Sequence, residues 1–178
     1  MGIFNVVLLF CCLYSVGAVN FPYELAQLNE SEIQKFPAIA FGNLSSSAAS
    51  YKGLRCRVGP GDHDWPSDQD WAIFNQSLGG NLLKPVPPGA VCYPGRNYDE
   101  EKCQFVAGPA ASTRFFLDEP LNVMTAWAEG NTCSPAVNAT GTCTQGGYPV
   151  YVVNATTVKD VQMAINFARN RNLRLNIK

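Results

Sequence analysis

The sequence lacks an excess of charge of either sign. Thirteen Lys and Arg residues are balanced by fourteen Asp and Glu residues, so the net charge is −1 at pH 7. Proteins that attract nucleic acid or an anionic membrane surface through their field carry a clear basic excess. The composition therefore argues against nucleic-acid and membrane partners, and it leaves the oligomeric state open.

Long apolar runs are also missing after the first eighteen residues. Residues 3–14 are almost wholly apolar and small residues follow, with Val16 and Ala18 at the positions that a signal peptidase reads. This run is shorter than the roughly 20 apolar residues that span a bilayer. We therefore predict a cleaved signal peptide over residues 1–18 and a soluble, secreted, extracellular mature protein.

Five Asn-X-Ser/Thr sequons agree with export. Such asparagines carry N-linked glycans when they lie on the surface of a secreted protein. The predicted glycosylation sites are Asn29, Asn43, Asn75, Asn138 and Asn154.

The short Cys-x2–4-Cys spacing of zinc sites is absent from the five cysteines that follow the predicted signal peptide. In an oxidising compartment the simplest pairing is Cys92 with Cys103 and Cys133 with Cys143, each contributing roughly 2–3 kcal/mol. Other connectivities stay open. Cys56 is left over, as a free thiol, as half of an intermolecular bond, or as the partner of a cysteine outside this sequence.

The middle of the chain predicts short helices between turns. Ser67 is a candidate N-cap for a helix over 68–78 that Gly79 and Gly80 end. A short strand at 82–83 and an extended, proline-stiffened segment over 85–92 follow. Acidic residues 99–101 favour the start of a second helix, which ends by Gly108. Residues 19–55 are predicted to be an arm with one short helical turn that Pro37 ends.

The last thirty residues show the most regular pattern. A β-branched strand at 151–153 precedes Thr157, a candidate N-cap with Asp160 three residues later. An apolar face then follows over a helix at 158–171, and it consists of Val158, Val161, Ala164, Ile165, Phe167 and Ala168. Residues 173–177 alternate apolar and polar side chains, which predicts a second strand and a right-handed βαβ unit.

Candidate chemical groups are few. His63 is the single histidine, and it stands between Asp62 and Asp64. Adjacent side chains do not converge on one metal ion, so an exposed turn is the better interpretation. Cys56 has no evident neighbouring base that would make it a nucleophile. Trp65, Trp71 and Trp127 are predicted to pack in or near the core rather than to form a sugar-stacking platform.

Two separate regions resemble one known family. Tyr148–Gln162 (YPVYVVNATTVKDVQ), continued by residues 169–175, resembles the opening βαβ unit of the FAD-binding domain of the vanillyl-alcohol oxidase (VAO) type. Upstream, Cys56–Gly61 (CRVGPG), Asp64–Pro66 and Pro87–Cys92 (PPGAVC) resemble the N-terminal extension of its secreted fungal branch, the berberine-bridge-enzyme-like FAD-linked oxidoreductases. Residues 142–149 fit the same branch.

The resemblance implies an α+β fold in three parts. Residues 1–18 form the signal peptide, and residues 19–147 form an irregular, disulfide-pinned N-terminal extension with short helices. Residues 148–178 form the first βαβ unit of a VAO-type FAD-binding domain, which is incomplete here.

The resemblance also implies FAD as cofactor and oxidation of a small molecule, an alcohol, sugar or related substrate, with O2 as acceptor. In that family the Gly-rich turn that cradles the FAD pyrophosphate and the histidine that attaches the flavin come after the segment matching 173–178. No residue of this sequence is therefore predicted to be a catalytic, flavin-linking or metal-binding residue. The chain alone is expected to be catalytically incomplete.

A second hypothesis comes from a different class of protein. The same leader, sequons and disulfides also suit a small secreted glycoprotein that acts by binding rather than by catalysis. Coding sequence beyond Lys178 that contains a Gly-rich turn and a histidine would favour the oxidoreductase.

Overall fold

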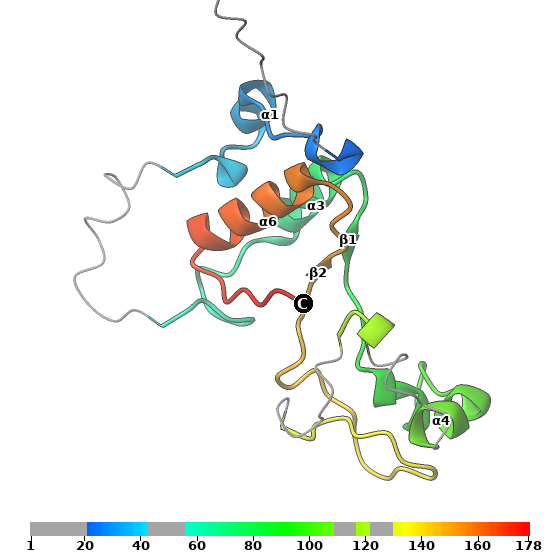
Figure 1. The fold of residues 1–178 in the computed structure, drawn as a ribbon. Helices are drawn as coiled ribbons and strands as arrows, with labels where there is room; N and C mark the ends of the chain where they lie inside the picture. The colour runs from blue at the N-terminus through cyan, green and yellow to red at the C-terminus, as the bar shows by residue number, and fades with distance from the viewer. Residues whose placement is uncertain (1–20, 43–55, 109–116, 122–129) are drawn as a thin grey trace, which may run out of the picture.

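The computed structural model describes residues 21–42, 56–108, 117–121 and 130–178. These residues form two lobes, which Figure 1 shows above and below the strands β1 and β2. The helical lobe consists of residues 21–42, 56–83 and 151–173. The cystine lobe consists of residues 88–108, 117–121 and 130–148. Within the described ranges, no helix is both long and apolar enough to cross a membrane.

Helix α3 (Asp68–Ser77) forms where the sequence predicted it. The Ser67 hydroxyl accepts a hydrogen bond from the Asp70 amide, and the Asp70 carboxylate accepts one from the Ser67 amide. This capping box satisfies amides that the first helical turn leaves without partners. Gly79 and Gly80 then turn the chain with φ of 64° and 93°, a region that favours glycine.

Helix α6 (Val158–Asn170) is the longest helix described, and it also begins at a capping box. The Thr157 hydroxyl accepts a hydrogen bond from the Asp160 amide. The buried Asp160 carboxylate accepts hydrogen bonds from the amides of Thr156 and Thr157 and from the Thr156 hydroxyl. Burial opposes ionisation of Asp160, but these hydrogen bonds outweigh it and hold the pKa of the carboxyl below its ordinary value of 3.8.

The sheet differs from the predicted βαβ unit. β1 (Leu82–Leu83) pairs antiparallel with β2 (Val152–Val153), with Leu82 opposite Val153. The predicted strand over 173–177 is wrong beyond its first residue, because only Leu173 forms a bridge, parallel to Val58. Alternation of side chains favours a strand, but a strand also needs a neighbouring backbone. Among the described residues, no ladder forms along 174–178.

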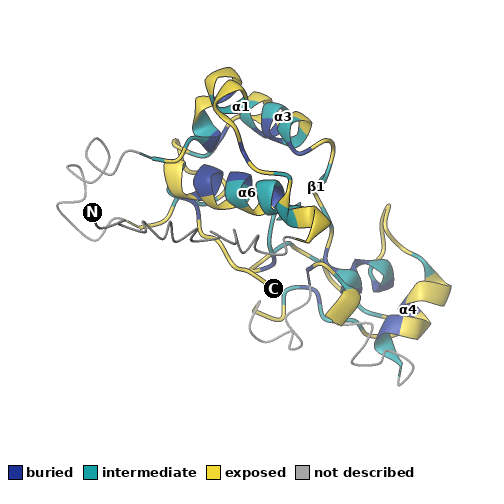
Figure 2. Cartoon of the chain, turned by 45° about the horizontal axis from the view of Figure 1, so that its top comes forward, coloured by how far each residue is buried: buried dark blue, intermediate teal, exposed yellow. Residues whose placement is uncertain are grey.

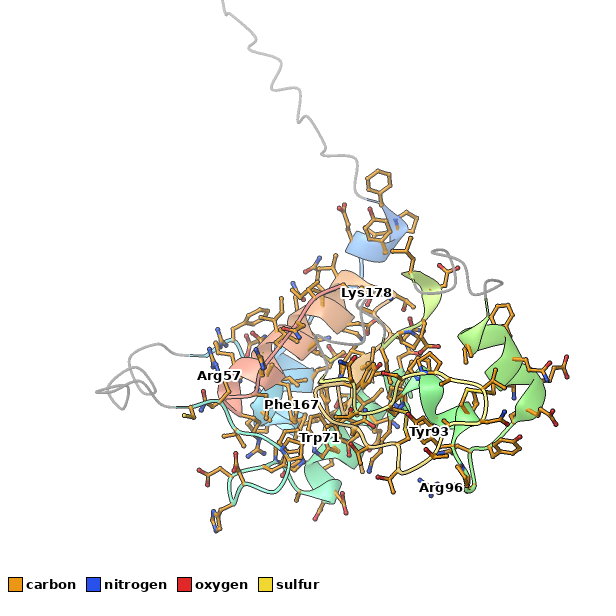
Figure 3. The ribbon with its side chains drawn as sticks, turned by 90° about the horizontal axis from the view of Figure 1, so that it is seen from below. Arg57, Trp71, Tyr93, Arg96, Phe167 and Lys178 are labelled. Atoms are coloured by element: carbon orange, nitrogen blue, oxygen red, sulfur yellow. A yellow bond between two sulfur atoms is a disulfide. The ribbon has the colours of Figure 1, made fainter. Side chains whose placement is uncertain are left out.

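An aromatic core holds the helical lobe together. Figure 3 shows Trp71 and Phe167 near one another inside the molecule, and their ring centroids lie 5.1 Å apart. Phe74 stacks on Phe167 at 4.2 Å. The buried members of this core are Leu28, Phe36, Ile39, Trp71, Phe74, Leu78, Met163, Phe167, Ala168 and Leu173.

The N-terminal arm packs on α6. It consists of η1 (Pro22–Glu24), α1 (Glu30–Lys35) and η2 (Pro37–Ile39). The buried Asn166 amide of α6 donates to the carbonyl of Ile39 over 3.0 Å. The Lys159 ammonium of α6 forms a 2.9 Å ion pair with Glu32 of α1, and Figure 2 shows α1 and α3 beside α6.

This packing rotates the buried face of α6 away from the predicted one. Met163, which the predicted face omitted, is 1% exposed, whereas Val161 and Ile165 are 44% and 40% exposed. Phe167 and Ala168 are buried as predicted. The arm covers the side of α6 that carries Asn166, which the apolar pattern of α6 alone could not reveal.

The cystine lobe folds around its two disulfides, Cys92–Cys103 and Cys133–Cys143. The first joins η4 (Pro88–Cys92) to α4 (Glu100–Ala107), and both bonds form as the sequence predicted. The prediction of an extended chain over 85–92 is wrong for η4, which is a 3-10 turn. Pro88 at its first position supplies a helical φ, so proline there starts a turn instead of extending the chain.

Candidate functional site

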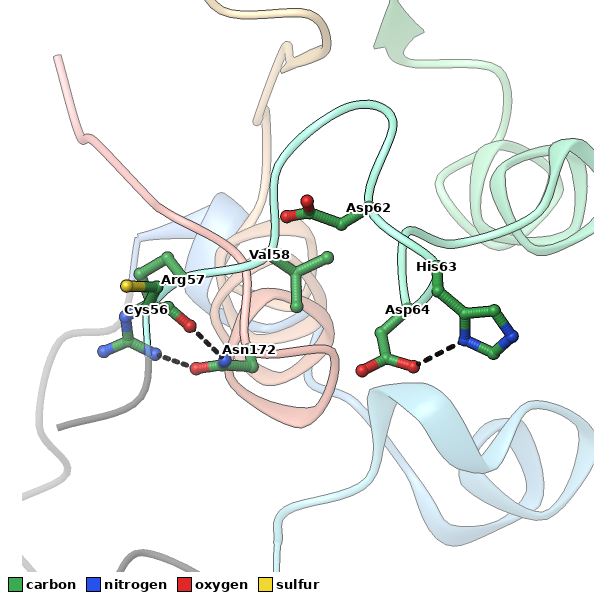
Figure 4. A pocket seen from close by; sticks show the side chains of 7 residues that line it. All are labelled: Cys56, Arg57, Val58, Asp62, His63, Asp64 and Asn172. Atoms are coloured by element: carbon green, nitrogen blue, oxygen red, sulfur yellow. Dashed lines mark hydrogen bonds and ion pairs between the residues drawn. The ribbon is translucent and has the colours of Figure 1, made fainter. Parts of the chain in front are cut away.

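A pocket of about 290 Å³ lies where the segment 56–64 meets the end of α6 (Figure 4). Asn172 forms hydrogen bonds with two of the other residues that line it. The Arg57 guanidinium donates to the Asn172 side-chain oxygen over 2.9 Å, and the Asn172 side-chain nitrogen donates to the Cys56 carbonyl over 3.0 Å. Asn172 has a φ of 53°, in the left-handed region that Asn tolerates better than most residues. The pocket is lined by Cys56, Arg57, Val58, Asp62, His63, Asp64 and Asn172.

His63 lies on the outer rim of this pocket. Its Nδ1 is 3.1 Å from the Asp64 carboxylate, and the two side chains are 102% and 81% exposed. Figure 4 shows the imidazole ring and the Cys56 thiol at opposite ends of the pocket. The exposed turn that the sequence predicted for residues 61–65 is what the structure contains, so water competes for every polar contact there.

The Cys56 thiol is exposed and forms no disulfide. The structure does not place His63 beside it as a base. Across the described ranges, no group of three His, Cys, Asp or Glu side chains is arranged to hold a metal ion. The pocket therefore offers neither an activated nucleophile nor a metal centre.

The two tryptophans that the structure describes pack against each other. Trp71 is 7% exposed and contacts Trp65, whose ring centroid lies 5.5 Å away. Trp65 is half-buried. Trp127 lies outside the described residues, and so do the predicted signal peptide and the sequon asparagine Asn43.

None of the sequon asparagines that the structure describes is buried. Asn29, Asn138 and Asn154 are exposed, and Asn75 is half-buried on α3. Asn29 accepts a hydrogen bond from the Glu32 amide, and Asn75 accepts one from the Leu82 amide. Both use the side-chain oxygen, so the nitrogen that would carry a glycan is not the bonded atom.

The residues that the structure describes do not form a site that fits a bound FAD. A phosphate site at the start of α6 would need free amides, but the Lys159 amide donates to the Ala26 carbonyl and the Asp160 amide to Thr157. Gly79 and Gly80 follow a helix, and Gly146 lies in a turn against Thr132. Neither forms the glycine turn between strand and helix that cradles phosphates. No step of a flavin reaction can be derived from these residues.

Comparison with known proteins identifies the relatives of this fold. No protein-family model matches the chain. FAD-linked oxidoreductase sor8 of Hypocrea jecorina is 38% identical over 144 residues, which is 80% of this chain and 24% of the relative. VAO-type flavoprotein oxidase VAO615 of Thermothelomyces thermophilus is 39% identical over 151 residues, 83% of this chain and 26% of the relative. The chain is homologous to fungal FAD-linked oxidoreductases of the VAO type over about four fifths of its length.

Solved structures agree with this assignment. The VAO-type flavoprotein MtVAO615 from Myceliophthora thermophila superposes on 70% of this chain with a TM-score of 0.62 and 37% identity, and the match covers 23% of that protein. MtVAO713 from the same organism superposes with a TM-score of 0.60 and 30% identity, over 67% of this chain and 22% of its own. The chain spans about a quarter of the length of the curated relatives it matches.

FAD is the cofactor of this VAO-type family. The relatives carry oxidoreductase names, so they favour the oxidoreductase hypothesis over the small binding glycoprotein. The sequence motifs around Cys56, Pro87 and Tyr148 were sufficient to find this family. Sequence reasoning missed Asn172, for which its position just after a helix was the available signal.

Proposed function

We propose that this chain is the amino-terminal part of a secreted FAD-dependent oxidoreductase that oxidises an alcohol, a sugar or a related small molecule, with O2 as the electron acceptor. The observation that carries the proposal is the match to VAO-type oxidoreductases over about four fifths of this chain and a quarter of theirs. The substrate class and the acceptor rest on the family resemblance.

The chain alone does not hold the flavin. FAD binding needs an enclosed site with convergent donors, whereas the pocket at Asn172 is polar and opens to solvent beside His63. The Lys159 and Asp160 amides at the start of α6 already have partners within the chain. The family's flavin chemistry therefore requires residues that this sequence does not supply.

Secretion and glycosylation form part of the same proposal. Both disulfides need an oxidising compartment, and Asn29, Asn138 and Asn154 are exposed. Expression in a filamentous fungus, followed by deglycosylation of the culture medium, tests this part. We expect the chain in the medium, starting near Val19, with a mobility that increases on glycan removal. A chain retained in cells with Met1 intact would contradict secretion.

Cofactor binding is tested on the same purified chain. We expect no visible flavin absorbance after gel filtration in the presence of FAD. A yellow chain that keeps flavin through the column would overturn the proposal that this chain alone is incomplete. Reading the transcript past the codon for Lys178 provides a second test, because we expect it to encode a Gly-rich turn and a histidine.

A further inference from the structure

The hydroxyl groups of the predicted glycosylation sites have different partners in the folded chain. A sequon consists of the asparagine that carries the glycan and a Ser or Thr two residues later, whose hydroxyl the glycan transferase also recognises. We call this group the sequon hydroxyl. A sequon is closed where this hydroxyl is donated to a group outside the sequon, and open where the hydroxyl is exposed or bonds within the sequon itself.

The sequon at Asn29 is open. Asn29, Glu30 and Ser31 are all exposed. The Ser31 hydroxyl donates to the side-chain oxygen of Asn29 over 2.7 Å. The hydroxyl and the carboxamide of this sequon therefore already lie against each other, and the carboxamide nitrogen is not the bonded atom.

The sequon at Asn138 is open as well. Asn138 and Thr140 are exposed, and Asn138 has a φ of 60°. The Ala139 amide donates to the Ala136 carbonyl over 3.1 Å, which closes a tight turn. An exposed turn presents both groups of the sequon without any change in the core of the cystine lobe.

The sequon at Asn75 is closed, because it lies inside α3. The Ser77 hydroxyl donates to the Ile73 carbonyl over 2.9 Å, and the Asn75 side-chain oxygen accepts from the Leu82 amide over 3.0 Å. The neighbouring Phe74 is 2% exposed. Presenting this sequon to an enzyme would unwind α3 and pull on the aromatic core.

The sequon at Asn154 is closed although Asn154 is exposed. The Thr156 hydroxyl donates over 3.1 Å to the buried carboxylate of Asp160, a charge-assisted hydrogen bond. At the other end of the sequon, the Asn154 amide donates to the Asn81 carbonyl over 2.9 Å. Exposure alone would group Asn154 with Asn29, whereas the sequon hydroxyl separates them.

The two closed sequons meet at a single peptide group. The peptide bond between Asn81 and Leu82 donates its N–H to the Asn75 side chain and accepts from the Asn154 amide with its C=O. The same Leu82 pairs with Val153 in the β1–β2 ladder. Pairing of β1 with β2 therefore fixes both sequons in one step.

From these contacts we infer that folding sorts the sequons by time: Asn75 and Asn154 accept glycans only before β1 pairs with β2, whereas Asn29 and Asn138 remain acceptors in the folded chain. The inference rests on the proposed secretion and glycosylation. A closed sequon is modified after folding only when its region opens locally, and α3 and the start of α6 are held by the core and by capping boxes.

The test uses the chain made without glycans in the bacterial periplasm, an oxidising compartment in which its disulfides can form. The folded chain, and a synthetic peptide centred on each described sequon asparagine, are treated with purified fungal oligosaccharyltransferase and its lipid-linked oligosaccharide. Mass spectrometry of peptides measures the modified fraction at each asparagine, and the synthetic peptides correct for differences between Ser and Thr sequons. We expect Asn29 and Asn138 to match their peptides, and Asn75 and Asn154 to react about tenfold or more slowly than theirs, because local opening must come first.

A pair of variants isolates the sequon hydroxyl. Asp160→Ala removes the acceptor of the Thr156 hydroxyl, so modification of Asn154 should rise while Asn75 stays slow. Asp99→Ala is the matched control, because it removes a carboxylate that caps α4 and should change neither site. Circular dichroism shows whether each variant folds. If Asp160→Ala unfolds the chain, Asn75 and Asn154 should both reach the rates of their peptides.

Modification of Asn154 in the folded chain at the rate of its peptide would overturn the inference. Slow modification of Asn29 and Asn138 would also overturn it, because the open sequons would then be closed as well. A chain that a filamentous fungus keeps inside the cell, but that shows the expected order of sites when purified, would support the inference and count against the proposed secretion.

Discussion

The indole ring of Trp71 stacks on the phenol ring of Tyr151, with centroids 4.0 Å apart and an interplanar angle of 22°. The pair joins α3 to the residue that precedes β2, and Lys84 Nζ lies 5.5 Å from the same Tyr151 ring centroid. The two chain segments that connect the lobes contain Lys84 and Tyr151. They therefore contact each other at the Tyr151 ring, next to the aromatic core. Its stability should control how firmly the cystine lobe is held.

Substitutions of Trp71 should show that its ring contributes more to stability than its N–H group does. The indole Nε1 is buried and has no hydrogen-bond partner among the described residues. Trp71→Phe keeps a ring against Tyr151 and removes an unsatisfied donor, so we expect a loss of about 1 kcal/mol or less. Trp71→Ala should cost about 3–5 kcal/mol through the cavity that it leaves. Urea unfolding followed by circular dichroism measures both, and equal losses would contradict this account.

Gly89 should tolerate no side chain. A Cβ at this position would clash with the Cys133 carbonyl oxygen, which is backbone and cannot move aside easily. We expect Gly89→Ala to destabilise the cystine lobe by roughly 2 kcal/mol or more, as overpacking does. Gly59→Ala is the matched control, because its nearest neighbour would be 3.7 Å away. Thermal unfolding should show a lower midpoint for the first variant and an unchanged midpoint for the second.

Acid should weaken the helical lobe through Asp160. The pKa of this carboxyl is lowered in the folded chain, so its stabilising effect is complete above its ordinary, unfolded pKa of 3.8. The effect is lost as the pH falls through the lower folded pKa. We expect the free energy of unfolding to fall below about pH 4, and Asp160→Asn to lower it already at pH 7 by about 1–2 kcal/mol.

The pH profile of Asp160→Asn distinguishes this cause from general acid unfolding. The variant should show a shallower decline below about pH 4 than the unaltered chain. The pKa of the Asp70 carboxyl is also lowered, by its hydrogen bond from Ser67 and by its Arg171 partner. Asp70 is present in both the variant and the unaltered chain, so it accounts for part of the decline that remains in the variant. Parallel pH profiles for Asp160→Asn and the unaltered chain would show that Asp160 does not contribute.

Loss of the Cys92–Cys103 disulfide should act locally. The bond closes a loop with a sequence separation of 11, for which loop entropy predicts about 3 kcal/mol. Its buried neighbours form a cluster with Val106, separate from the aromatic core. In Cys92→Ala/Cys103→Ala we expect faster amide hydrogen exchange in α4 and unchanged exchange in α6. Faster exchange in both helices would mean that the lobes unfold together.

Local signals in the sequence were enough to predict helices α3, α4 and α6. Ser67 and Thr157 stand where a hydroxyl can cap a helix, and the structure uses both hydroxyls in that way. The glycines after α3 and the acidic start of α4 are equally local. The pairing of cysteines followed from short spacing, because a loop of that length closes with little loss of entropy.

The sequence pattern could not predict contacts between segments that are far apart in the chain. The arm docks on α6 through polar groups such as Gln162, whose side-chain oxygen accepts from the Leu28 amide over 2.9 Å. Polar side chains of this kind carry no periodic signal, so the exposed positions Val161 and Ile165 were assigned to the buried face. The antiparallel pairing of Leu82 with Val153 joins residues far apart in sequence, and two-residue strands give no pattern from which to derive a partner.

The pairing of β1 with β2 brings together the two ends of the segment that forms the cystine lobe. The chain leaves the helical lobe at Leu83 and returns at Val152, and these two residues lie opposite each other. The described residues between them carry both disulfides and two small buried clusters. We expect an insertion anchored in this way to tolerate changes in its length while β1 and β2 keep their register.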